Sequence, residues 1–106
     1  MSSAQQSQGG KGAIPHLLAH NPKDNVAVVV VEGLKAGTHA FGVITETNEA
    51  FEIDVHDDVP IGHKVALKDL SPGDTVIKYG EDVGRIVAPA TRGHHVHTQN
   101  MKTKRW

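Results

Sequence analysis

Histidine is concentrated near the C-terminal end of the chain, in the segment Gly93-His94-His95-Val96-His97-Thr98-Gln99-Asn100. In an extended segment, side chains two residues apart point the same way, so His95, His97 and Gln99 are predicted to share one face. Imidazole is the commonest neutral metal ligand and the side chain that titrates closest to physiological pH. The segment therefore has the residue types of a metal site or a general acid–base site. The alternative is a solvated histidine-rich tail, because the segment lacks a complete tetrahedral ligand set.

The elements that must position these side chains are predicted to be β-strands. Val26 to Val31 is a continuous apolar run, typical of a strand buried on both faces. Phe51 to Val55 alternates apolar and acidic residues, which indicates one buried and one solvated face. No long stretch has helical spacing. We therefore predict an all-β fold, one small domain with glycine-rich turns. The shorter strand candidates are residues 40–45, 64–67, 75–78 and 84–87.

Four predicted turns follow one pattern, in which an apolar residue and two spacers precede glycine and a polar residue. A glycine at this place supplies the positive φ that a type II turn requires. The residues after two of the glycines are His63 and His94. The turns are therefore predicted to place these two histidines at the entrance of a strand. The copies are Leu34 to Thr38, Val59 to His63, Leu70 to Asp74 and, less regularly, Thr91 to His94.

Composition narrows the class of protein. The chain has 106 residues, the size of one domain, and no cysteine, which excludes a disulfide or a catalytic thiol. Eleven basic and twelve acidic residues give a net charge of −1, which argues against a nucleic-acid partner. The longest apolar run is too short to span a membrane, and the N-terminal residues lack the apolar core of a secretory signal. We expect a cytoplasmic protein with a disordered lead at residues 1–15 and a domain at 16–106.

Three segments resemble a known family and occur in its order. They are Pro60 to Leu70 with its Gly-His-Lys, Ile77 to Arg85 with its Lys-Tyr-Gly, and the closing His-Val-His with Asn100. The chain is similar, from about residue 20 onward, to the SAF domain of altronate and galactarate dehydratases. In some members of that family, such as sulfolactate sulfo-lyases, the domain is a separate small chain. The resemblance implies a β-clip fold.

The resemblance also implies a function. It is that of the small subunit of a two-component lyase, which catalyses β-elimination from a hydroxy acid and is inactive without a large catalytic partner. Sulfite release from (2R)-sulfolactate is the leading reaction, because the domain stands as a chain of its own. The alternatives are a part of a sugar-acid dehydratase, altronate or galactarate type, and a non-catalytic module that binds sugar acids or anions. A divalent metal, Fe²⁺ in the dehydratases, is expected to be held mainly by the large subunit. The resemblance is also compatible with a homo-oligomer of this chain.

The candidate site combines residues that match the family's motifs with one further cation, Arg85. Lys64 or Arg85 would pair with a carboxylate or sulfonate, although Lys64 could be merely solvated and Arg85 paired with a neighbouring acid. Asn100 would donate to a carboxylate oxygen. The catalytic residues and candidate metal ligands are His95 and His97, and the candidate substrate-binding residues are His63, Lys64, Arg85 and Asn100.

The chain departs from the family's pattern at two positions. His94 stands where an acidic residue is usual, and Gln99 replaces the last histidine. A glutamine is a poor ligand for a divalent metal, so a three-histidine site from this segment alone is not expected. Tyr79, in the Lys-Tyr-Gly motif, is interpreted as a packing aromatic whose hydroxyl reaches the domain edge.

Overall fold

The computed structural model describes residues 14–103, and these contain nine strands and no helix. The all-β prediction is confirmed. The predicted disordered lead lies outside the described residues, apart from its last two. No helix in the described part of the chain is long and apolar enough to cross a membrane. The strands are β1 (Leu17–Ala19), β2 (Val26–Val29), β3 (His39–Ile44), β4 (Glu49–Asp54), β5 (Lys64–Ala66), β6 (Thr75–Lys78), β7 (Glu81–Ile86), β8 (His95–Val96) and β9 (Met101–Thr103).

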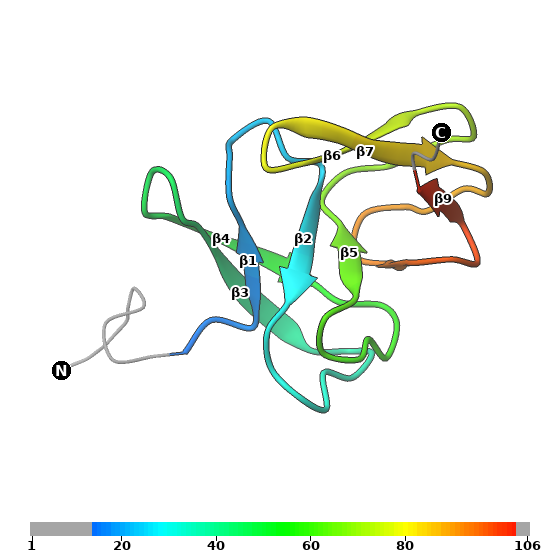
Figure 1. The fold of residues 1–106 in the computed structure, drawn as a ribbon. Coiled ribbons are helices and arrows are strands. Elements are labelled where there is room, and N and C mark those ends of the chain that lie inside the picture. The colour runs from blue at the N-terminus through cyan, green and yellow to red at the C-terminus, as the bar shows by residue number, and fades with distance from the viewer. Residues whose placement is uncertain (1–13, 104–106) are drawn as a thin grey trace, which may run out of the picture.

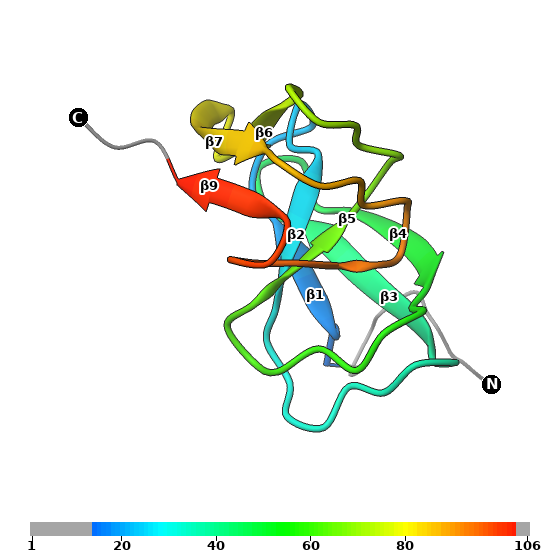
Figure 2. The same ribbon diagram turned by 90° about the vertical axis from the view of Figure 1, so that its right-hand side faces the viewer.

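The strands form two sheets. The larger has the order β4-β3-β1-β2-β5-β8, and the smaller has the order β6-β7-β9. Only β1 and β3 pair in parallel, and every other pair is antiparallel. The smaller sheet lies across one end of the larger sheet, with β9 near the C-terminal end of the described chain (Figures 1 and 2). Within the larger sheet, β8 pairs with β5, although the two strands lie far apart in the sequence.

The four repeated turns build the corners of the domain. Their glycines all have a positive φ, as predicted, and each glycine N–H donates to a backbone carbonyl of another segment. Apolar residues at the starts of the turns pair two by two. Leu34 bridges Val59, and Leu70 bridges Ala90, the residue just before the fourth turn. The internal repeat in the sequence is thus a repeated corner in space. The values of φ are +91° at Gly37, +89° at Gly62, +95° at Gly73 and +91° at Gly93.

The two faces of β2 contribute to two separate cores. Ala27 and Val29 pack into the cluster shared with β1, β3 and β4, while Val26 packs into the cluster shared with the smaller sheet. Val28 and Val30 are only half-buried. The prediction that the run from Val26 to Val31 is buried on both faces was therefore wrong. The reason is that the smaller sheet covers only the Val26 end of this face.

Candidate functional site

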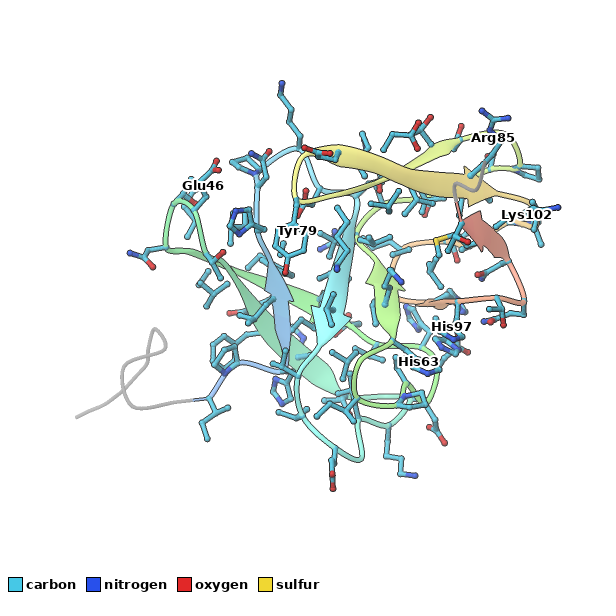
Figure 3. The ribbon with its side chains drawn as sticks, viewed as in Figure 1. Glu46, His63, Tyr79, Arg85, His97 and Lys102 are labelled. Carbon is cyan, nitrogen blue, oxygen red and sulfur yellow. The ribbon has the colours of Figure 1, made fainter. Side chains whose placement is uncertain are left out.

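The pairing of β5 with β8 gathers three histidines. Lys64 lies opposite Val96 and Val65 opposite His95, so the same register places His63 opposite His97. Directly opposed residues point to the same face, and the rings of His63 and His97 stack with centroids 3.7 Å apart and planes 17° apart. His63 Nδ1 also lies 2.8 Å from His95 Nε2. We call His63, His95 and His97 the histidine trio; Figure 3 shows His63 and His97 side by side.

Gln99 indicates the tautomer of His95 and, through it, that of His63. Its Nε2 is 3.2 Å from His95 Nδ1 and 3.4 Å from the His95 carbonyl oxygen. Because a carbonyl only accepts, the amide nitrogen must face it, and the same nitrogen then donates to His95 Nδ1. Neutral His95 consequently carries its proton on Nε2 and donates to His63 Nδ1. His63 is left with its proton on Nε2. The hydrogen bonds therefore run in one direction, from Gln99 through His95 to His63.

Two side chains hold the backbone of the trio in place. Asn100 is 7% exposed; its Oδ1 accepts from the His97 N–H at 2.9 Å and its Nδ2 donates to the His95 carbonyl at 2.8 Å. Asp57 Oδ2 accepts from the His95 N–H at 2.9 Å and lies 3.0 Å from His94 Nδ1. The His95 N–H, with help from His94, lowers the pKa of Asp57 despite partial burial. Asp57 therefore remains a carboxylate, which completes a rigid frame around His95.

Burial and neighbouring cations lower the pKa of His95 and His97. Desolvation lowers the pKa of His95, and charge on His63 or His97 would lower it further, against a smaller opposing effect of Asp57. Desolvation also lowers the pKa of His97, with contributions from His63 and Lys64. The pKa of Lys64 is itself lowered by burial and by Lys78. At neutral pH the imidazoles of His95 and His97 are therefore uncharged, which is the form that binds metals and exchanges protons.

A cleft of about 270 Å³ opens beside the trio. Of the trio, only His95 lines it, together with Asp57, His94, Gln99, Asn100 and residues 89–91. At about 30 Å³ per water molecule, this volume equals roughly nine waters, enough for an organic acid of a few carbon atoms. The lining combines these polar side chains with the apolar Pro89 and Ala90.

The chain matches the family model described as the altronate/galactarate dehydratase SAF domain over residues 15–104. It belongs to this family. It is 46% identical over 89 residues to a (2R)-sulfolactate sulfo-lyase subunit alpha of Chromohalobacter salexigens, covering 84% of this chain and 95% of that one. It is 59% identical over 64 residues to the same-named subunit of Paracoccus pantotrophus, covering 60% and 96%. An altronate dehydratase of Bacillus subtilis is 34% identical over 76% of this chain, which spans only 15% of that enzyme.

This SAF domain brings together some of the predicted residues and separates others. His95 and His97 share a face, as predicted, with ring centroids 5.8 Å apart. His63 joins them and supplies the third imidazole that Gln99 does not. Arg85 lies on β7 of the smaller sheet, opposite Lys102 of β9, and is apart from the trio (Figure 3).

The sequence analysis did not find Asp57. Asp57 is 38 residues from His95 in the chain, and no spacing rule connects the two. The available signal was its position just before the repeated corner that begins at Val59, since that corner leads to His63.

The residues of the trio fit a divalent transition metal as donors. Their ring nitrogens lie within 4.8 Å of one another. His97 Nδ1 is buried and has no hydrogen-bond partner among the described residues, so its bonding capacity is unused. His63, His95 and His97 would be the residues that hold such an ion, with imidazole nitrogens as the donors. The trio therefore offers a ligand set, and at rest it is arranged as a hydrogen-bonded relay.

Proposed function

We propose that this chain is the small subunit of a two-component lyase that releases sulfite from (2R)-sulfolactate. The observation that carries the proposal is the match along almost the whole length of two sulfo-lyase alpha subunits, 95% and 96% of their chains. The dehydratase relatives support the alternative less, because this chain spans only 12–15% of them. A subunit designated alpha implies at least one further subunit, and we propose that it carries most of the catalytic machinery.

The reaction requires three kinds of group. A base removes the proton from C2, the C–S bond at C3 breaks with its electron pair leaving on sulfite, and the resulting enol becomes pyruvate. The enediolate that develops on the carboxylate needs hydrogen-bond donors or a metal ion, and the two anionic ends of the substrate need cations. The small subunit offers hydrogen-bond donors and a cation, but fewer groups that could act as the base.

The hydrogen-bond pattern of the trio supports the following roles. His63 has its proton on Nε2, because its Nδ1 accepts from His95. An unpaired buried N–H is rarer and costlier than an unpaired lone pair, so neutral His97 also carries its proton on Nε2 rather than on the buried Nδ1. His63 and His97 thus present donors to a substrate carboxylate, and His95 orients His63. Lys64 balances the charge of the sulfonate or carboxylate. We propose that the base belongs to the large subunit.

A divalent metal, Fe²⁺ by analogy with the dehydratases, would be held by His63, His95 and His97 if this chain binds it. When bound it would supply Lewis acidity at the substrate carboxylate or hydroxyl. Asn100 and Asp57 would then hold the backbone of the ligands, and Lys64 would keep its place beside His97. The hydroxy-acid assignment does not depend on which subunit holds the metal.

The test is reconstitution with the large subunit of the same enzyme. The mixture is expected to release sulfite from (2R)-sulfolactate, and each subunit alone is expected to release none. Altronate and galactarate, offered to the same mixture, separate the alternative: dehydration of either at the higher kcat/KM would replace the sulfo-lyase with a dehydratase. Binding of sugar acids by this chain alone, with no activity in the mixture, would favour the non-catalytic module.

A further inference from the structure

The Lys-Tyr-Gly motif has no part in the trio, yet it holds a strained residue. Tyr79 and Gly80 form the two-residue loop between β6 and β7, with φ of +59° and +72°. This is the backbone of a type I′ turn, in which the first position favours asparagine or glycine and a bulky side chain is rare. Tyr79 is also 56% exposed, so the interpretation as a packing aromatic was wrong. A strained and exposed aromatic residue suggests a use outside the fold.

The turn that carries Tyr79 is fixed to the larger sheet. Asp24 Oδ1 accepts from the Gly80 N–H at 2.7 Å, and Asp24 Oδ2 accepts from two further backbone N–H groups. Asn25 accepts from the Ile77 N–H at 2.7 Å and donates to the Thr75 carbonyl at 2.9 Å. The ring of Tyr79 is therefore presented from a rigid support, which reduces the entropy lost when a rigid aromatic residue binds a partner.

Beside Tyr79 runs a groove of about 180 Å³ with an apolar floor. The floor is made by Leu18 of β1 and by Val26, Val28 and Val30 in and after β2. The rim carries His20, Lys78 and Tyr79; the His20 and Tyr79 rings are 4.6 Å apart, and Lys78 Nζ lies 4.5 Å from the centre of the Tyr79 ring. We call this feature the Tyr79 groove.

Lys64 lies next to both the groove and the trio. Lys64 lies opposite Val28, and Val28 lies opposite Leu18, so the three side chains form one row on the same face of the sheet. Lys64 also directly follows His63 in the chain and influences His97. Because consecutive residues of a strand point to opposite faces, the row lies on the other face of the sheet from the trio and ends one residue away from it. Figure 3 labels Tyr79, His63 and His97.

The charge along this row is unbalanced. Within residues 14–103 neither Lys64 nor Lys78 has an ion-pair partner, and the ion pairs that do occur involve other cations. Asp24 lines the groove, but its carboxylate is occupied by backbone N–H groups; burial raises its pKa, and these N–H groups more than offset that effect and lower the pKa. Two unpaired ammonium groups thus flank an apolar floor and an exposed tyrosine. The exposed Tyr79 matches the aromatic anchors that dominate binding in protein interfaces, and the two ammonium groups would complement an acidic partner.

We propose that the Tyr79 groove is where the large lyase subunit docks, by inserting an apolar side chain next to a carboxylate. The proposal rests on the proposed function, because it takes the occupant to be the other subunit of that enzyme. A partner seated there would meet Lys78 with its carboxylate and, at the end of the Leu18–Val28–Lys64 row, Lys64. In dehydratases such as that of Bacillus subtilis, the aligned domain is 15% of a longer chain. Those enzymes have the remainder of the chain available in cis for the same contact.

The test uses Tyr79→Asn and Lys78→Glu in the full chain, with Lys68→Glu as the matched control. Asparagine removes the ring but suits the left-handed turn, so Tyr79→Asn is expected to be at least as stable as the wild type. Lys68 is exposed and outside the groove, so its replacement makes the same charge change elsewhere. Binding to the purified large subunit is measured by calorimetry, and stability by urea denaturation.

Both groove variants are expected to raise the Kd for the large subunit by about tenfold or more, while Lys68→Glu leaves it unchanged. A wild-type complex that both groove variants form with unchanged affinity would overturn the docking site and leave the proposed function standing. A wild-type chain that binds no large subunit would overturn the proposed function, and the docking site with it.

Discussion

One hydrogen bond links His63 and His95. Their Nδ1 and Nε2 atoms are 2.8 Å apart, and the position of Gln99 requires that the proton belongs to His95. Gln99 therefore does more than leave this face of the segment without a third imidazole. It selects one tautomer of His95, and through it one tautomer of His63, which leaves an N–H of His63 free to meet a substrate.

Gln99→Glu should reverse this relay. A carboxylate only accepts, so it would draw the proton of His95 to Nδ1; His95 Nε2 would then accept from His63 Nδ1. The ¹⁵N chemical shifts of the two imidazoles, measured at neutral pH, distinguish the tautomers directly. The wild type is expected to show His95 and His63 protonated on Nε2. Thr98→Ala, at an exposed neighbouring position, is the control and should leave both tautomers unchanged. A wild-type His95 protonated on Nδ1 would contradict the assignment.

The histidines should titrate on opposite sides of their ordinary pKa, about 6.5. His95 and His97 are expected below it, because they are desolvated and lie near other cations. His39 is expected above it, because it bonds to the carboxylates of Asp54 and Glu52, each at 2.6 Å. Proton NMR titration of the metal-free chain measures all three in one sample, with His39 as the internal control. Equal midpoints for His95 and His39 would rule out the proposed electrostatics.

The same shifts give a pH dependence of stability. For His95 and His97 the unfolded chain binds more protons than the folded chain between their lowered pKa values and about pH 6.5. The stability due to their neutral state is thus complete above about pH 6.5 and is lost as the pH falls through that window. His39 acts in the opposite direction, so its contribution is present below about pH 6.5 and is lost as the pH rises through its folded pKa. Replacing His39 with Gln should therefore make the loss of stability on acidification steeper in urea denaturation.

Gly93→Ala should destabilise the fold more than Gly73→Ala. The two glycines have nearly equal φ, +91° and +95°. A Cβ at Gly73 meets open space, whereas a Cβ at Gly93 would overlap the Asp54 carbonyl oxygen and approach His56 Cδ2 to 2.7 Å. Gly73→Ala therefore isolates the cost of the backbone conformation, about 1–2 kcal/mol. Gly93→Ala adds the clash, for a total of about 3 kcal/mol or more. Equal losses in the free energy of unfolding would show that the corner yields to the extra methyl group.

His97→Ala should lower turnover of the reconstituted complex by about tenfold or more, equivalent to about 1.4 kcal/mol of barrier. The donor that meets the substrate is removed, whereas the main-chain bonds from Asn100 remain. The control is His39→Ala, because His39 is exposed on β3 and contacts only acids of β4. Unchanged turnover for His97→Ala would place His97 among the surface residues without a role in the reaction.

The sequence was enough to predict the class of fold and most strands. β6 has the predicted bounds, Thr75–Lys78, and β2 to β5 and β7 overlap their predicted ranges. β1 and β9, with three residues each, are too short to show a periodicity. The pattern of turn glycines was predictable because only a residue without a Cβ adopts that φ freely.

The site was less predictable, since it depends on contacts between distant segments. The pair His95 and His97 follows from strand alternation, but the position of His63 beside them requires the register of β5 against β8. Tyr79 was misread because a packing role is the usual one for an aromatic residue, and only the turn geometry shows that its ring faces solvent. Asp57 acts through a backbone N–H, and such a contact leaves no pattern in the sequence.

The most direct test of the account is sulfite release from (2R)-sulfolactate by this chain mixed with its large subunit. The account predicts sulfite and pyruvate in equal amounts from the mixture and none from either subunit alone. Full activity of the large subunit without this chain, or of this chain without the large subunit, would contradict it.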